Sequence, residues 1–252
     1  MGVKKMVEKI VKTTQGKPTD SDDYIVHQKI TKPCEHKVDG AVEVAKYIVK
    51  EIKKNVKSQQ AANMRYMNDY QGRLNSWKKL PLWQRIFTPV PKPMNIEAMA
   101  LWTERVFKGR PWDHKIHIPN LFAKVAVARM QYSHTQKKVI LYSKIYHKYK
   151  NYDYYYDIWS NIHYGYVGLS VGFSQEILLN GANMAQIIDS LGRNTEDPPD
   201  DVTAINIGFS LFKKFGVFAN KLNYEDVLKE IHAQPDSKFP NSRKKHVCLE
   251  KK

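Results

Sequence analysis

The side chains best suited to chemistry in this sequence are acids that lie near three short motifs. They are Asp113, Asp157, Glu176, Asp197, Asp200 and Asp201. Two carboxylates held several ångströms apart can cleave a glycosidic bond, one as the acid and the other as base or nucleophile. We take Asp113, Asp197 and Asp200 as the candidate catalytic acids.

The first motif is GRPWDHK, residues 109–115, where glycine and proline interrupt a helical pattern. Such breaks form surface loops, which often carry catalytic groups. Asp113 is the first choice for the catalytic acid, and Lys115 could hold it ionised or bind a substrate anion. Trp112 could contact the substrate. The structural alternative is that Asp113 caps a helix while Trp112 anchors the loop in the core.

Asp197 and Asp200 flank the start of a predicted helix. They could serve in a catalytic pair of carboxylates. They could equally cap the helix and interact favourably with its dipole. The sequence leaves both interpretations open.

The second motif lies in an apolar segment, residues 156–171, that contains glycines although glycine weakens helices. A rotation of about 100° per residue gives two opposite stripes on a helix. They are Trp159, His163, Tyr166 and Ser170 on one side, and Asn161, Gly165, Gly168 and Gly172 on the other. Aligned glycines allow either tight helix packing or a backbone surface beside a substrate cleft. In the second case Asn161 could bind a substrate acyl or hydroxyl group.

His163 is a further candidate for acid–base chemistry, as is His114 of the first motif. In a nuclease one of these histidines would be the acid or base, and lysines would hold the phosphates. The alternative for His163 is a core histidine with a satisfied hydrogen bond.

The elements that must position these residues are predicted to be helices. Helical spacing of apolar residues covers 40–57, 64–77, 94–107, 120–134, 138–149, 156–171, 174–191, 201–216 and 224–232. No sustained alternation typical of strands is evident. We therefore predict a mostly α fold, a single multi-helical domain for which a lysozyme-like architecture is one candidate, with an N-terminal basic arm and helix.

Three regions follow from the composition along the chain. Residues 1–93 are predicted to form a basic arm, an amphipathic helix and a Pro-rich connector, residues 94–235 the catalytic domain, and residues 236–252 a loose, charged tail. The helix at 40–57 carries a face of lysines, which is either a solvated surface or a site for a polyanion.

The amino-acid composition indicates which classes of partner the protein could bind, but it says little about the reaction that it could catalyse. The 252 residues carry a formal net charge of +16, and 42% of them are hydrophobic, which is enough for a core. Such a charge favours nucleic acid, an anionic membrane or the bacterial cell wall, or it serves solubility alone. No apolar run reaches 18 residues, so we expect no stable membrane insertion.

The two cysteines, Cys34 and Cys248, are far apart in polar surroundings. We expect them to form neither a metal site nor a disulfide, as in a protein kept in a reducing compartment. The N-terminal segment lacks the apolar run of a signal peptide. We therefore expect a protein made in the cytoplasm and exported, if at all, without such a signal. No cofactor is expected.

Three ordered blocks resemble the bacterial polymorphic toxin type 44 family. They are GRPWDHK (109–115), NIHYGYVGLSVGFSQEILLNGANMAQ (161–186) and EDPPDDVTAINIG (196–208), and the similarity covers roughly residues 94–220. The matching positions are Trp112, Asp113, Lys115, Asn161, Tyr164, Gly165, Gly168, Gln186, Asp197 and Asp200. Glu196 stands where the family has an aspartate.

The resemblance implies an antibacterial toxin used in competition between bacteria. It implies delivery by a type VI or related secretion machinery into a target bacterium and neutralisation by a cognate immunity protein. It also makes Asn161, Tyr164, Gly165, Gly168 and Gln186 candidates for substrate binding, together with Trp112.

Two kinds of toxin are compatible with the sequence. One hydrolyses peptidoglycan in the periplasm by lysozyme-like glycan cleavage, which suits an α-rich fold, aromatic residues, paired acids and a basic charge. The other is an RNase or other nuclease acting on RNA in the cytoplasm of the target cell. The first is preferred because no convincing pair of histidines is found.

Overall fold

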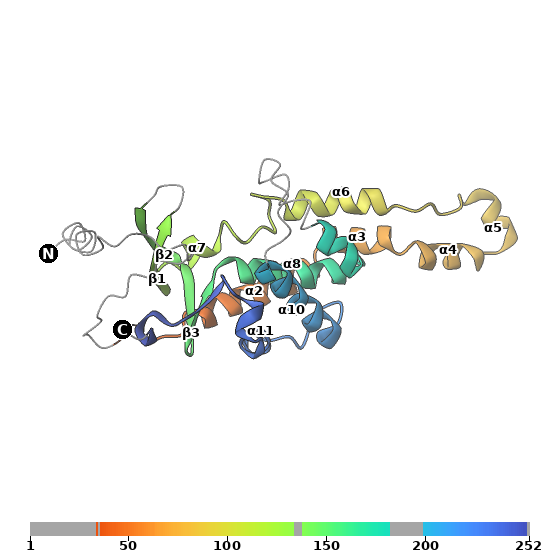
Figure 1. The fold of residues 1–252 in the computed structure, drawn as a ribbon. Coiled ribbons are helices and arrows are strands. Elements are labelled where there is room, and N and C mark those ends of the chain that lie inside the picture. The colour runs from red at the N-terminus through yellow and green to blue at the C-terminus, as the bar shows by residue number, and fades with distance from the viewer. Residues whose placement is uncertain (1–33, 35, 134–137, 182–198, 251–252) are drawn as a thin grey trace.

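The computed structural model of the chain describes residues 34, 36–133, 138–181 and 199–250. Most of these residues are helical, as predicted, and a four-stranded antiparallel sheet lies at one end (Figure 1). The predicted arm at 1–33 lies outside the described residues. Among the described helices none is both long and apolar enough to cross a membrane.

Helix α2 (Ala41–Asn55) is an integral part of the hydrophobic core. Its apolar residues recur every three or four positions, so one face is buried, including Val44, Ile48 and Ile52. That face packs against α8 (Asp157–Ser170) and α11 (Tyr224–Ala233). Residues on both sides of the boundary predicted at residue 93 contribute to one hydrophobic core.

A helical projection follows α2 (Figure 1). It comprises α3 (Gln59–Asn68), α4 (Tyr70–Lys78), α5 (Leu82–Phe87) and α6 (Asn95–Val106). Helices α4 and α5 extend away from the body, and α6 runs back to contact α3. The Pro-rich connector predicted within residues 1–93 corresponds to residues 81–93, which form the turn of this projection.

The sheet replaces two predicted helices. After a short helix α7 (Ile118–Leu121), β1 (Ala126–Ser133), β2 (Lys138–Tyr149), β3 (Tyr152–Tyr155) and β4 (Arg243–Lys245) pair in that order, each antiparallel to the next. The helices predicted at 120–134 and 138–149 are therefore wrong. The segment KVILYSKIYHKY of β2 is rich in β-branched and tyrosine residues, which fit a pleated surface better than a helix.

Residues 236–252 were predicted to form a loose, charged tail, but the described part of this segment, residues 236–250, is packed against the rest of the protein. β4 pairs with β3, and a short 3-10 helix η1 (Asp236–Lys238) precedes it while η2 (Val247–Leu249) follows. Phe239, Arg243 and His246 are all buried. Lys238 and Lys245 of this segment are exposed, while the buried side chains of Phe239, Arg243 and His246 pack into the interior.

The two cysteines were expected not to form a disulfide, and the structure differs from this expectation. Cys34 and Cys248 lie side by side and are joined as a disulfide, with their Cα atoms 5.6 Å apart. His36 and His246 lie next to them, so the four side chains form one cluster of potential metal ligands. Spacing along the chain could not reveal this cluster, because it forms only when the two ends of the described chain meet.

Helices α8 and α10 (Pro199–Phe215) pack unusually closely at the centre of the molecule. A Cβ added at Gly165 would clash with the backbone carbonyl of Ile205, and one added at Gly208 would clash with the carbonyl of Ile162. Only glycine permits this approach of two backbones. The glycine stripe predicted on this helix therefore serves helix packing at Gly165, and Gly168 packs against Leu178.

Candidate active site

A pocket of about 430 Å³ opens where α6, the loop after it, α8 and α10 meet. Its apolar walls include five aromatic side chains: Trp102, Phe107, Trp112, Tyr156 and Tyr164. Its polar groups include Asp113, Lys115, Ser160, Asn161 and Asp201. A pocket with apolar walls and a few convergent polar groups is the usual form of an active site.

Asp201 and Asn161 form the polar pair at the junction of two helices. Asp201 lies in the first turn of α10, and its Oδ1 accepts a hydrogen bond of 2.8 Å from Nδ2 of Asn161 on α8. The close approach at Gly165 and Gly208 brings these helices together. The packing role of the glycines thus positions a carboxylate in the pocket.

Asp157 lies one helical turn before Asn161 on the same face of α8. Its Oδ1 is buried and has no hydrogen-bond partner among the described residues. Burial raises the pKa of Asp157 to about 7; Lys115 opposes this rise, and the charge of Asp201 adds to it. Asp157 therefore has the properties of a carboxylic acid that holds a proton near neutral pH.

Lys115 lines the pocket and interacts electrostatically with Asp201 and Asp157. Burial acts to lower the pKa of Lys115, but the negative charges of Asp201 and Asp157 outweigh this effect, and the pKa is raised above its ordinary value. Lys115 therefore stays positively charged, which partly offsets the repulsion between the two carboxylates.

Asp113, the first choice from the sequence, lines the same pocket, but both of its carboxylate oxygens accept hydrogen bonds from backbone N–H groups. Its Oδ2 accepts from the N–H of Gly109 at 2.9 Å, and its Oδ1 accepts from the N–H of Lys115 at 3.0 Å. Gly109 has a φ of +77°, which suits glycine at this turn. Asp113 thus closes the loop that carries Trp112 and Lys115.

Asp200 points away from the pocket and fixes the C-terminal segment. Its carboxylate accepts hydrogen bonds from the N–H of Asn241 at 3.1 Å, from Nδ2 of Asn241 at 3.1 Å and from the N–H of Ser242 at 2.9 Å. These bonds account for its burial. The other candidates Asp197 and Gln186 lie outside the described residues.

His163 is a core residue in this structure. It is fully buried, and its Nε2 lies 2.9 Å from Nδ2 of Asn55 on α2. Its ring contacts that of His114, with centroids 4.3 Å apart, and His114 is in turn 2.9 Å from the hydroxyl of Tyr47. Burial lowers the pKa of both histidines, that of His114 to about 4. Neither histidine lines the pocket.

Of the remaining candidates, Trp112 and Tyr164 line the pocket, whereas Gly165 and Gly168 do not. Trp112 packs edge-on against Trp102, with ring centroids 6.0 Å apart, and both line the pocket. Tyr164 lines it too and donates a hydrogen bond of 3.0 Å to the carbonyl of Leu178. Gly165 and Gly168 face packed neighbours and do not line the pocket.

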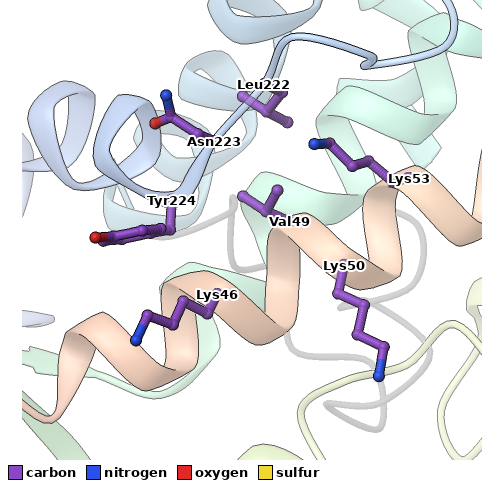
Figure 2. A pocket seen from close by; sticks show the side chains of 7 residues that line it. All are labelled: Lys46, Val49, Lys50, Lys53, Leu222, Asn223 and Tyr224. Carbon is purple, nitrogen blue, oxygen red and sulfur yellow. The ribbon is translucent and has the colours of Figure 1, made fainter.

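A second, shallower hollow of about 350 Å³ lies on the lysine face of α2 (Figure 2). Lys46, Lys50 and Lys53 of α2 line it on one side. On the other side lie Leu222, which precedes α11, and Tyr224, the first residue of α11. Among the described residues that line this hollow, the charged ones are all lysines.

One family model covers the segment that builds the main pocket. Residues 101–214 match the bacterial toxin 44 family. All the pocket-lining residues except Met99 lie within the toxin 44 segment. Helix α2 and the four-residue cluster of cysteines and histidines lie outside it. No curated protein and no solved structure gave a significant match to the chain.

The family match agrees with the resemblance based on the three motifs. Within the toxin 44 segment, the sequence motifs identified five residues that line the pocket: Trp112, Asp113, Lys115, Asn161 and Tyr164. They did not select Asp157 or Asp201, although both were among the acids near the motifs. The available signal was the four-residue spacing of Asp157 and Asn161, which places both on one helical face.

Proposed function

We propose that the protein is an antibacterial toxin that hydrolyses peptidoglycan by cleaving a glycosidic bond. The observation that carries this proposal is a pair of interacting carboxyl groups at a pocket with aromatic walls: Asp201 lines the pocket, and Asp157 is a buried neighbour that does not line it but interacts electrostatically with Asp201. Glycosidases need one carboxyl group that is protonated and one that is ionised. Environments that push two pKa values apart assign these two tasks.

Asp157 would be the general acid. Its raised pKa keeps a proton available near neutral pH, and this proton would go to the glycosidic oxygen as the bond to the anomeric carbon breaks. Asp201, oriented by Asn161, would be the ionised partner that activates a water molecule or attacks the anomeric carbon. Lys115, which interacts electrostatically with Asp201, would supply a positive charge beside it.

The pocket walls suit a sugar chain. Trp102, Trp112 and Tyr164 present flat apolar surfaces with polar edges, which is the kind of surface on which sugar rings pack. Asn161 and Ser160 supply polar contacts for acyl or hydroxyl groups. The net charge of +16 would promote adhesion to the anionic wall.

The location of the histidines disfavours the nuclease alternative in the form that the sequence suggested. Its proposed acid or base, His163 or His114, is buried outside the pocket and paired with core residues. A phosphodiester in the pocket would face the carboxylates of Asp113 and Asp201 as well as the ammonium groups of Lys108 and Lys115. Secretion machinery, an immunity protein and a periplasmic target remain part of the proposal.

Expression of the chain in the periplasm and in the cytoplasm of a bacterium tests the proposed function. We expect the full chain to stop the growth of a bacterium lacking the immunity protein when an added signal sequence exports it to the periplasm. The same chain retained in the cytoplasm should be tolerated, because its substrate lies outside the inner membrane. Growth curves with microscopy for cell rounding and lysis provide the readout.

Two single substitutions, one as the test and one as its control, link the toxicity to the proposed site. Exported Asp157→Asn should be harmless, whereas exported Glu97→Gln, at an exposed position on α6, should remain toxic. Arrest by the cytoplasmic chain alone would contradict wall hydrolysis and favour a nuclease.

A further inference from the structure

The four potential ligands near the chain ends form a compact cluster outside the pocket. Cys34 and His36 precede α2, while His246 and Cys248 flank the start of η2. One sulfur or nitrogen atom from each lies within 4.8 Å of all the others. The sequence pattern is Cys-x-His on one side and His-x-Cys on the other.

The distances in the cluster suit a tetrahedral metal site. The Cys34 sulfur lies 3.3 Å from Nε2 of His246 and 3.9 Å from Nδ1 of His36, and the Cys248 sulfur lies 3.6 Å from Nδ1 of His36. With Zn–S bonds of about 2.3 Å and Zn–N bonds of about 2.0–2.1 Å, a tetrahedron places sulfur and nitrogen about 3.5 Å apart. The observed separations scatter around that value.

A buried carboxylate fixes the orientation of one of the histidines. Nδ1 of His246 lies 2.6 Å from Oδ1 of Asp153, so with the proton on Nδ1 its Nε2 offers a lone pair to the cluster. Asp153 has no exposed surface, and its Oδ2 accepts hydrogen bonds from Arg129 at 2.6 Å and from the N–H of Val247 at 3.1 Å. Carboxylate–histidine pairs of this kind are a regular feature of zinc sites.

We propose that Cys34, His36, His246 and Cys248 bind one Zn²⁺ ion when the two cysteines are reduced. The donor set of two sulfurs and two imidazoles selects zinc over calcium or magnesium, which prefer oxygen ligands. On binding, each thiol releases its proton to solvent, and the two thiolates balance the charge of the ion. Both histidines bind in the neutral form.

The disulfide and the zinc site use the same cysteines in different states. A disulfide involves Cys34 and Cys248 alone and gives no role to the imidazoles directed at their sulfurs. The zinc site uses all four side chains. With four protein ligands it has no open position for a substrate, so its role is structural.

Zinc would tie together two segments far apart in the sequence. Cys34 and Cys248 are separated by 214 residues, and the second segment continues from β4 of the sheet. Binding that exists only in the folded chain adds its free energy to folding. The site would stabilise the chain in a reducing cytoplasm, where a disulfide does not persist. None of the four residues lines the pocket, so this inference does not depend on the proposed function.

Metal analysis of the full chain tests the inference. Protein made in a reducing cytoplasm and purified anaerobically without chelator should contain about one zinc per chain by plasma mass spectrometry. Exchange with Co²⁺ should give the thiolate charge-transfer band and the intense visible bands of tetrahedral cobalt. His36→Ala should reduce zinc to near zero yet still form the disulfide on oxidation, whereas His117→Ala, at an exposed position outside the cluster, should keep the metal.

Reduced, folded protein that takes up neither Zn²⁺ nor Co²⁺ would overturn the inference. So would zinc content that His36→Ala leaves unchanged, because the metal would then bind elsewhere. Removal of zinc from the reduced wild-type chain by a chelator should lower its melting temperature, and restoring Zn²⁺ should return it.

Discussion

Asp157→Asn should reduce glycan hydrolysis by several orders of magnitude while the protein stays folded. Asparagine has nearly the same shape but cannot donate a proton to the leaving oxygen, so the step that depends on a general acid is lost. The measurement is the initial rate of release of soluble fragments from purified peptidoglycan, with circular dichroism as the check on folding. Glu97→Gln, which removes an exposed charge on α6, is the control and should retain the wild-type rate.

The wild-type rate should also depend on pH in one direction. With a pKa of about 7, Asp157 is protonated below that pH and ionised above it, so activity should fall as the pH rises through about 7. Wild-type activity that stays constant from pH 6 to pH 9, or an active Asp157→Asn protein, would remove Asp157 from the mechanism.

The same pKa has a consequence for stability. Because the folded-state pKa of Asp157 lies above the ordinary value of 3.8, the folded protein binds the proton more tightly than the unfolded chain. The stability that this proton contributes is present at low pH and is lost as the pH rises through about 7. Asp157→Asn should therefore be at least as stable as the wild type above pH 7, in contrast to its loss of activity.

Asp201→Asn should have an equally large effect on the rate for the opposite reason. Asp201 is the proposed ionised group, and the substitution removes the negative charge that would activate water or attack the anomeric carbon. It also removes one cause of the raised pKa of Asp157, so the fall of residual activity with pH should move to lower pH. Rates across pH 5–9 for Asp201→Asn and for the Glu97→Gln control provide the measurement.

An Asp201→Asn protein with wild-type activity would show that the ionised partner is another carboxylate. Asp113 would then be the next candidate, because it also lines the pocket. Loss of folding in Asp201→Asn would be recognised from its circular dichroism. In that event Asn161→Ala, which frees the Asp201 carboxylate from its 2.8 Å hydrogen bond, provides a second test of the same pair.

The sequence predicted the helical parts of the fold where apolar spacing was regular. Helix α2 is the clearest case, since its buried residues recur at three- and four-residue intervals. The sheet was missed because strands β1 and β2 mix lysine, arginine and polar residues with β-branched ones, which hides the alternation. The sheet depends on pairing between strands, including β3 with β4 across about 90 residues, and no local pattern reports such pairing.

The sequence predicted only part of the site, because the choice among its acidic residues depends on how distant segments pack together. The motifs located the loop with Trp112 and the helix with Asn161, because these residues stand in distinctive local contexts. The choice among acids required three-dimensional information. Asp200 and Asp201 are neighbours in the sequence, yet one carboxylate binds the backbone at Asn241 and Ser242 and the other lines the pocket.

The cysteine cluster illustrates the same limit. Cys34 and Cys248 each have a histidine two residues away in the sequence, but the grouping of all four side chains depends on the C-terminal segment lying beside Cys34 and His36. Burial of His246 against Asp153 fixes this arrangement.

Analysis of the products from purified peptidoglycan tests the central claim most directly. Sacculi incubated with the purified full chain would be separated by liquid chromatography and identified by mass spectrometry. The account predicts disaccharide-containing fragments with new reducing ends, formed by the wild type and by Glu97→Gln but not by Asp157→Asn. Intact glycan strands after incubation with folded wild-type protein, accompanied by degradation of added RNA, would contradict it.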